Sequence, residues 1–347
     1  MKEKKYVYIF TLLVFLFIGF HLMVWTFFTK DLFIYKDNMV VGDLGRMSYL
    51  TESLTLRKNE QILPSKHIQY NDNVEVDVLS IGDSFSNGGG AGTNRYYQDY
   101  ISTIQNLKVM NIQHSNKGFI ETVLILDGNG ILDKLNPKII ILQSVERSAI
   151  KIYSKNIDWD IGLKNYSTLF LDKKYNHSKP KPSFINNLNY NALLYPLLYK
   201  YYDNAIFSKT YISTLTRNLF SCENKDKLLF YVEDLKYIPK SNKKSIALLN
   251  NNLNKLQIKL KDKNIKLYFM PSVDKYNLYS KYIKNNQYKK STFFEILREF
   301  KKEYNFIDTK MILEKMLDNN VSDVYYSDDT HWSYKASKEI FNKVKLK

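Results

Sequence analysis

Two motifs far apart in the chain carry the residue types of a nucleophile and its base. Ser84 ends the tripeptide GDS, and His331 follows Asp328 and Asp329 in the segment SDDTHWS. A serine hydroxyl is a poor nucleophile at neutral pH unless a base takes its proton, and the pKa of histidine suits that task. A carboxylate beside the histidine orients the ring and stabilises the imidazolium. The residue types therefore predict nucleophilic catalysis by Ser84.

Each motif also has an ordinary structural interpretation. Gly-Asp-Ser is common turn chemistry, and an Asp or Ser before a helix often acts as its N-cap. The pairing of the motifs favours the catalytic interpretation, because His331 is the histidine with close acidic neighbours. The other histidines lie in an apolar run (His21) or in polar stretches without an adjacent carboxylate (His67, His114 and His177).

The segments around the motifs predict an α/β fold with a parallel sheet. A strand rich in β-branched residues is expected at 74–81 and ends at the GDS motif. Further strands are expected at 108–112, 139–142, 265–270 and 305–307, and helices at 96–104, 120–126, 245–261, 291–304, 309–317 and 334–344. This alternation is typical of a parallel sheet covered on both faces. Such sheets bind ligands at the carboxyl ends of their strands, so both motifs should meet at one edge.

The turn before Ser84 is also expected to serve catalysis. Gly82 allows the chain to turn sharply after the strand, and Asp83 lies inside the turn. The backbone N–H groups that follow such a turn can point at a developing oxyanion. We therefore place Asp83 among the candidate oxyanion or substrate-binding residues.

The N-terminal region predicts a membrane anchor. Residues 6–28 contain no charged side chain. As a helix they span about 35 Å, enough for a hydrocarbon core of about 30 Å. Lysines at positions 2, 4 and 5 precede the run, so residues 1–5 are expected in the cytoplasm and everything after Phe28 outside. The alternative is a cleaved signal peptide, but its apolar region is usually about 7–15 residues and ends at small residues.

Three further segments follow the anchor. Residues 29–73 are expected to hold a domain off the membrane, and residues 74–347 to form that domain. The stretch 151–244 is rich in Tyr, Asn and Lys and has weak periodicity. We expect it to be a partly helical insertion that forms a lid or an acceptor-binding wall.

Composition argues against several classes of partner. The net charge is +16, but only six basic residues are Arg, and the Lys are spread along the whole chain. Nucleic-acid surfaces are usually clustered and rich in Arg, so no nucleic-acid partner is expected. The charge can still attract an anionic wall polymer or lipid surface. The single Cys222 excludes an intramolecular disulfide, and no CxxC, HExxH or GxxxxGK[ST] motif indicates a metal or cofactor.

The two motifs give the chain a resemblance to the SGNH (GDSL-like) hydrolase superfamily. Within it, the chain resembles the acetyltransferase branch that includes the alginate and peptidoglycan O-acetylation proteins and the DHHW-type proteins. GDSF at 82–85 matches the first block and DDTHW at 328–332 the last. Weaker similarities are PSVDK at 271–275 and VER at 145–147. The resemblance covers residues 74–150 and 245–347.

The resemblance implies a three-layer α/β/α domain with a parallel sheet, in which Ser84 is the nucleophile and His331 the base. The acetyltransferase relatives often use the Asp two residues before the His, here Asp329. Ordinary hydrolases use the one three before, here Asp328. Gly118 corresponds to the second-block glycine that donates to the oxyanion.

The third block of the superfamily has no counterpart here, because its Asn is absent. Gln143, Glu146 and Arg147 follow the corresponding strand instead. Two interpretations of Arg147 stay open. It orients an acyl donor or an anionic sugar at the sheet edge, or it begins a helix and pairs with Glu146 or Asp133.

The resemblance implies O-acetylation of an extracytoplasmic glycan, either exopolysaccharide or peptidoglycan, through an acetyl-Ser84 intermediate. It also implies that a multi-span membrane acyltransferase supplies the acetyl group. Three alternatives stay open. They are an acetylesterase of the same fold, a catalytically inactive glycan-binding subunit of an acetylation complex, and a basic adaptor at the membrane surface.

Overall fold

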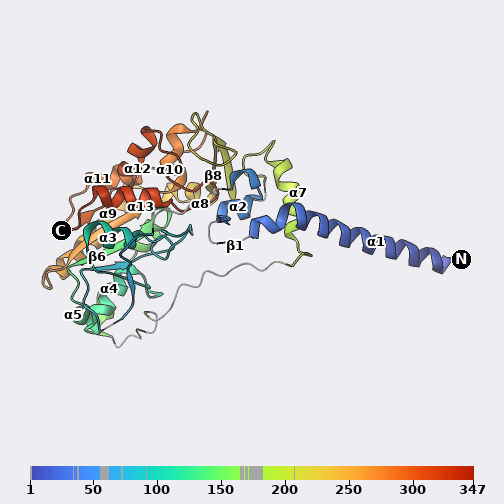
Figure 1. Cartoon of the computed structure of the whole chain (residues 1–347). Helices are drawn as coiled ribbons and strands as arrows, with labels where there is room; N and C mark the ends of the chain where they lie inside the picture. The colour runs from blue at the N-terminus through green and yellow to red at the C-terminus, as the bar shows by residue number, and fades with distance from the viewer. Residues whose placement is uncertain are drawn as a thin grey trace.

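The computed structural model describes residues 2–33, 35–36, 39–54, 62–71, 73–90, 92–164, 168, 171, 183–206 and 208–347. A long helix, α1 (Lys2–Val24), projects from an α/β body, and the C-terminus lies at the far end of that body (Figure 1). The helical stretch Glu3–Thr29 has a mean hydropathy of 2.5 and is long and apolar enough to cross a membrane.

A six-stranded parallel sheet forms the centre of the body, in the order β10-β9-β6-β4-β5-β3. Its strands are β3 (Ile68–Gln69), β4 (Val78–Ile81), β5 (Val109–Ile112), β6 (Ile139–Val145), β9 (Lys266–Ser272) and β10 (Asn305–Phe306). From β4 the chain passes to β5 on one side and then to β6 on the other. The boundary between β4 and β6 is therefore the topological switch point, where open α/β sheets bind their ligands.

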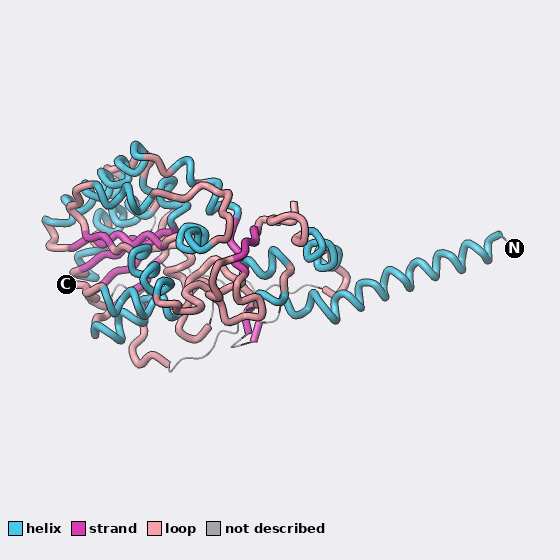
Figure 2. Tube along the Cα trace, turned by 90° about the horizontal axis from the view of Figure 1, so that it is seen from above, coloured by secondary structure: helices cyan, strands magenta, loops and turns pink. Residues whose placement is uncertain are grey.

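Helices cover both faces of the sheet (Figure 2). One group, in mutual contact, consists of α3 (Tyr97–Gln105), α12 (Thr309–Asp318) and α13 (Tyr334–Lys343). The other consists of α4 (Phe119–Gly128), α6 (Glu146–Tyr153), α9 (Lys243–Lys261) and α11 (Phe293–Glu299). Shorter helices are α2 (Asp43–Ser48), α5 (Ile131–Leu135), α8 (Val232–Lys236) and α10 (Lys275–Tyr279). The predicted α/β class with a parallel sheet is confirmed.

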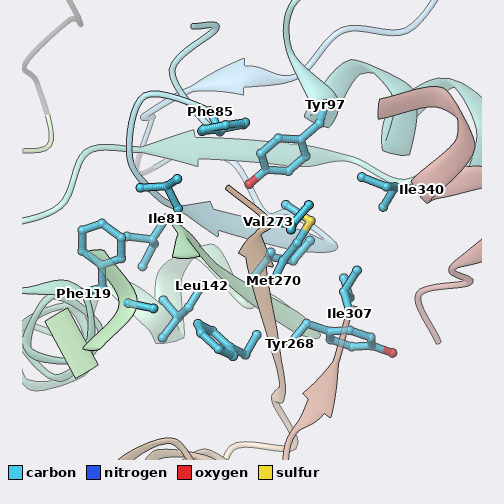
Figure 3. Packing of buried hydrophobic residues seen from close by; sticks show 14 of the residues in the cluster. Ile81, Phe85, Tyr97, Phe119, Leu142, Tyr268, Met270, Val273, Ile307 and Ile340 are labelled. Carbon is cyan, nitrogen blue, oxygen red and sulfur yellow. The ribbon is translucent and has the colours of Figure 1, made fainter. Parts of the chain in front are cut away.

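The central strands of the sheet are apolar and are buried between the two groups of helices. Every residue of β4, β5 and β6 is buried, as expected for a parallel sheet covered on both faces. Ile81 and Leu142 lie opposite each other in the β4–β6 register and pack near Phe119 of α4 (Figure 3). Burying such a side chain contributes about 1.5–3 kcal/mol. The strand ends that carry the GDS motif are thus firmly placed.

Several predicted boundaries were wrong: β4 begins at Val78 rather than at 74, and β6 continues to Val145 rather than ending at 142. Two further errors have identifiable reasons. The strand expected to stop before Pro271 continues to Ser272. Proline has no N–H to donate to a neighbouring strand, but pairing with β10 ends at Phe269, so Pro271 interrupts no pairing on that side. The helix expected over 291–304 covers only Phe293–Glu299. The segment that follows Glu299 is bound instead by side chains of α9, because the amides of Asn250 and Asn254 both donate to the carbonyl of residue 301.

The segments 29–73 and 151–244 are more closely built into the fold than expected. Strand β3 of the first segment joins the sheet, and α2 packs against a hairpin of β7 (Thr210–Thr214) and β8 (Lys227–Tyr231) from the second. Residues 29–73 are therefore more than a spacer. Helix α7 (Leu188–Leu198) of the insertion lies against α1, and the role of the insertion as a lid or acceptor-binding wall stays a prediction.

Candidate active site

The turn after β4 is held by the carboxylate of Asp83. Its Oδ2 accepts a hydrogen bond from the backbone N–H of Val145 (2.6 Å), and its Oδ1 accepts one from Phe85 (3.1 Å). The N–H of Asp83 in turn donates to Gln143 Oε1 at 3.1 Å. These bonds tie the turn to the end of β6. The structure thus gives Asp83 a positioning contact in the turn that presents Ser84.

Gly82 is required by close packing rather than by a special backbone angle. A Cβ at this position would lie 2.0 Å from Ser86 Oγ and 2.4 Å from Gln143 Oε1. Gln143 is fully buried and also donates to Ser272 Oγ at 3.0 Å, so it links the ends of β4, β6 and β9. The sequence interpretation had the right glycine but a different reason for it.

Ser84, His331 and Asp329 form a continuous chain of hydrogen bonds. Ser84 Oγ lies 2.7 Å from His331 Nε2, and His331 Nδ1 lies 2.7 Å from Asp329 Oδ1. The backbone N–H of His331 also donates to Asp329 Oδ1 at 3.0 Å. Because the carboxylate accepts from Nδ1–H, the network assigns Nε2 as the atom that accepts the Ser84 proton. The two motifs therefore meet at the switch point.

Asp328 has a different role from its neighbour. It is fully buried, and its Oδ2 accepts a hydrogen bond from the N–H of Gly42 at 2.7 Å. Its carbonyl accepts one from Gly45 at 2.9 Å. Of the two candidate carboxylates, Asp329 is the one bonded to the imidazole, whereas Asp328 fastens α2 to the catalytic loop.

The surroundings of His331 favour its charged form. Burial by itself would lower the pKa of this histidine, because it penalises the imidazolium. The charge and hydrogen bond of Asp329, with the charges of Asp43 and Asp83, outweigh burial and raise the pKa above its usual value. The imidazole is thus a stronger base, and its neutral form is lost as pH falls through the raised pKa.

Asp43, which the sequence did not indicate, buttresses the catalytic loop from α2. Its Oδ1 accepts from the N–H of Thr330 (2.8 Å) and its Oδ2 from the hydroxyl of Thr330 (2.5 Å). Burial first and the charge of Asp329 second raise the pKa of this carboxyl. Its partner lies 287 residues away, so no local spacing could have revealed the contact.

We expect two substitutions of Asp43 to separate its charge from its contacts. Asn keeps one acceptor oxygen for Thr330 and can donate from its NH2 group to the Thr330 hydroxyl, but it removes a negative charge, so the pKa of His331 should fall. The acid limb of kcat/KM should then move to lower pH, as a pH–rate profile would show. Ala also frees the loop and should lower kcat by roughly 10²-fold, a typical cost of misplacing a catalytic group. Profiles unchanged in both variants would contradict this positioning role.

Lys275 binds the backbone of the loop that carries His331. Its buried Nζ donates to the carbonyls of Tyr326 (2.7 Å), Ser327 (2.8 Å) and Asp329 (3.1 Å). Burial lowers the pKa of Lys275 to about 8, although the charges of Asp328 and Asp329 oppose the shift. The motif PSVDK, a weak similarity in the sequence, thus supplies a cation around which the catalytic loop folds.

A glycine-rich loop lies against His331. A Cβ on Gly89 would lie 2.2 Å from His331 Nε2, and the N–H of Gly89 donates to the carbonyl of Ser84 at 2.7 Å. Gly88 and Gly90 have φ angles of 73° and 86°, which favour glycine. The glycine run, visible in the sequence without a function, thus allows the loop to approach the imidazole.

Gly89→Ala is expected to lower kcat by roughly 10²-fold by displacing the His331 ring. Its φ is not in the left-handed region, so thermal unfolding should change little. Gly130→Ala is the matched control, because Gly130 has a φ of 68° but open space around its Cβ. That variant should lose stability and keep activity. Full activity of Gly89→Ala would refute the close approach.

Arg147 is held by carboxylates that the sequence did not identify. Its guanidinium donates to Asp274 Oδ1 (2.6 Å) and Asp234 Oδ1 (3.2 Å). The expected partners are engaged elsewhere: Glu146 accepts from the N–H of Asp274, and Asp133 pairs with Lys263. Asp234 comes from the insertion, which explains why the pairing was missed. The paired guanidinium favours the structural interpretation of Arg147, and its contact with substrate stays a prediction.

The second-block glycine stays a prediction as well. Gly118 precedes α4 with a φ of 139°, and a Cβ there would meet Glu121 and Lys155. No hydrogen bond within the described residues joins it to Ser84 or His331. The N–H of Ser84 itself donates to no acceptor in the described part of the chain, so it is available to an oxyanion.

A second histidine–carboxylate pair lies in the sheet's edge region. His67 Nδ1 lies 2.7 Å from Asp99 Oδ1, although no carboxylate is adjacent in the sequence. The other ring nitrogen lies 2.9 Å from Gln69 Nε2, so it meets an amide rather than a hydroxyl nucleophile. This pair links the segment around β3 to α3 and has the contacts of a structural element.

A metal ion bound by Asp43, Asp329 and His331 would compete with the hydrogen bonds of these residues. Potential ligand atoms of Asp43, Asp329 and His331 lie within 4.8 Å of one another. However, His331 already uses Nδ1 for Asp329 and Nε2 for Ser84. A cation at this cluster would have to replace the bond that orients the imidazole.

No protein-family model, curated protein or solved structure matches this chain. A serine hydroxyl bonded to a basic imidazole, itself oriented by a carboxylate, is suited to attack on an ester or thioester carbonyl.

Proposed function

We propose that the chain is a membrane-anchored serine O-acetyltransferase that modifies an extracytoplasmic glycan. The observation that carries the proposal is the hydrogen-bond chain from Ser84 through His331 to Asp329 at the switch point of the sheet. A six-stranded parallel sheet with helices on both faces is compatible with the three-layer SGNH-like domain that the motifs suggest.

In the first half-reaction, His331 Nε2 takes the proton of the Ser84 hydroxyl as Oγ attacks the acetyl carbonyl of the donor. The tetrahedral oxyanion is stabilised by backbone N–H groups, including that of Ser84. It collapses when His331 returns the proton to the leaving group. The enzyme then carries an acetyl ester on Ser84 and a neutral imidazole.

In the second half-reaction, a sugar hydroxyl enters beside the imidazole. His331 takes its proton, the sugar oxygen attacks the acetyl-serine carbonyl, and the Ser84 alkoxide leaves with the proton from Nε2. Asp329 holds the ring in one orientation through both steps and stabilises its charged form. Water can replace the sugar, so access of the acceptor decides between transfer and hydrolysis.

Two features favour transfer and an external location. The carboxylate bonded to His331 lies two residues before it, which is the arrangement implied by the resemblance to the acetyltransferase branch. The lysines at positions 2, 4 and 5 precede the apolar helix, which favours a cytoplasmic N-terminus and an external domain. The acetyl group would come from a multi-span membrane acyltransferase.

The test uses the full-length chain in lipid nanodiscs, because Val24 of α1 packs in one cluster with Ala192 of the insertion. A chromogenic acetyl ester is the donor, with and without a soluble glycan acceptor. Ser84→Ala is the control. Acetyl release and acetyl on the glycan are measured separately, and acetyl-Ser84 is sought by peptide mass spectrometry.

Acetyl on the glycan that depends on Ser84 supports the transferase. Release to water alone, with every acceptor tested, identifies an acetylesterase of the same fold. Equal rates for wild type and Ser84→Ala, without acetyl-Ser84, contradict catalysis by this serine and favour a glycan-binding subunit.

A further inference from the structure

Helix α7 of the insertion lies directly against the apolar helix α1. Asn189 Nδ2 lies 2.8 Å from His21 Nδ1, and Tyr190 stacks on Phe20 with ring centroids 5.1 Å apart. His21 is buried by this contact, which explains a polar residue inside the apolar run. These contacts fix the position of α7 along the axis of α1, next to Phe20 and His21.

This contact position lies within the apolar run of residues 6–28. His21 is 28 − 21 = 7 residues before Phe28, the last residue of the uncharged stretch. At 1.5 Å per residue, the contact is about 10 Å below the end of the run. Interfacial helices bury their apolar side about 5–10 Å into the boundary between headgroups and acyl chains. If α1 spans the membrane, α7 therefore begins at interfacial depth.

The direction of α7 also suits an interface. The helix runs across α1 in Figure 1 and is seen nearly end-on in Figure 2. A helix that crosses a membrane-spanning helix in this way lies roughly in the plane of the membrane. The hydrogen bond to His21 and the ring contact with Phe20 hold it there.

The side chains of this segment match a lipid boundary. Residues 183–199 contain no charged side chain. Leu194, Leu197 and Tyr190 of α7 are 43%, 57% and 49% exposed. Phe184 and Ile185 of the segment are also exposed, as are Tyr201, Tyr202 and Ile206 just beyond it. An uncharged helix that leaves leucine and tyrosine side chains exposed is unfavourable in water but stable in a membrane interface, where Tyr is enriched.

Charges lie only at the ends of the two apolar segments. Lys30 follows the run of α1, and Lys200 follows α7; both are exposed. Amines at these positions can reach phosphate headgroups while their stems cover apolar surface. This arrangement favours lipid over a protein partner, whose apolar groove would need no such cationic rim.

We propose that α7 is a second membrane contact, embedded in the outer leaflet beside α1, that fixes the orientation of the domain relative to the lipid surface. The inference rests on α1 as the membrane anchor and is independent of the chemistry proposed for Ser84. A domain with one flexible anchor would tumble freely. A domain held at two points presents one fixed face to the membrane.

The test places an environment-sensitive fluorophore (NBD) on single introduced cysteines of the full-length chain. Cys222 is buried, and burial raises the pKa of its thiol, so it can remain, with labelling of wild type as the blank. The positions are Leu197→Cys on α7, Phe15→Cys within α1, and Leu163→Cys. Leu163 is the matched control, because it is a leucine of the same insertion and is 87% exposed.

The purified chain is reconstituted in vesicles of phosphatidylcholine and phosphatidylglycerol, with or without bromine on the acyl chains. We expect blue-shifted emission that bromolipid quenches at positions 197 and 15, and water-like, unquenched emission at 163. Quenching at 15 but not at 197 would refute the α7 contact and leave a site for a protein partner. No quenching at either position would overturn the anchor together with the inference.

Discussion

Alanine at Ser84 or at His331 is expected to lower kcat by about 10⁴–10⁶, because the two residues act as one proton-transfer unit. In the proposed mechanism, Ser84 supplies the oxygen that bonds to the acyl group, and His331 Nε2, which lies 2.7 Å from Ser84 Oγ, removes its proton. Steady-state turnover of the chromogenic acetyl ester measures the effect. The thermal midpoint should change little, because neither side chain belongs to the apolar core.

The double variant provides the sharper comparison. If Ser84 and His331 form one unit, the variant lacking both should be no slower than either single variant. His114→Ala is the control, since His114 is a histidine of the same domain that is exposed and contacts only the carbonyl of Ser115 in its own loop among the hydrogen bonds described. Losses that add, or a comparable loss in His114→Ala, would show that the two residues do not work together.

Asp329→Asn is expected to lower kcat by about 10⁴, the cost of replacing the orienting carboxylate in a serine triad. An amide at this position can offer a donor to Nδ1, which favours the wrong tautomer and leaves Nε2 protonated. The change is nearly isosteric, so the fold should persist. Turnover and the thermal midpoint, measured on the same preparation, separate the two effects.

Asp328→Asn provides the comparison inside the same loop. Asp328 is buried and accepts from Gly42, so its loss should reduce stability by about 1–3 kcal/mol while much of the activity remains below the new midpoint. If a folded Asp328→Asn protein were inactive and Asp329→Asn remained active, Asp328 would be the carboxylate of the triad. The assignment made from hydrogen bonds would then be wrong.

The two variants address a choice that spacing alone could not make. Both carboxylates lie within three residues of His331, and an extended loop can turn either one toward the ring. The structure separates them, because Gly42 and Gly45 bind Asp328 and the backbone N–H of His331 binds Asp329.

Local pattern predicted the main elements of the sheet well. Strands β4, β5 and β6 overlap the expected ranges, because a strand buried on both faces needs a continuous apolar sequence, although β4 begins four residues later and β6 ends three residues later than expected. Local pattern gave the wrong end for β9 at Pro271 and for α11 at Glu299. At both places the end of the element depends on which neighbouring strand or helix supplies hydrogen bonds. Such neighbours are invisible in a local window.

By itself, the sequence determined the parallel α/β class, the apolar helix, and the two loops that carry Ser84 and His331, since each depends on residues close together in the chain. Tertiary structure alone decided the roles of Asp43, Lys275 and Asp234. Asp43 and Thr330 are 287 residues apart, and Arg147 and Asp234 are 87 apart. The contacts of Asp43 and Asp234 arise only when residues 29–73 and the insertion fold onto the sheet edge, because side-chain charge and hydrogen bonding act over a few ångströms of space, whatever the separation along the chain.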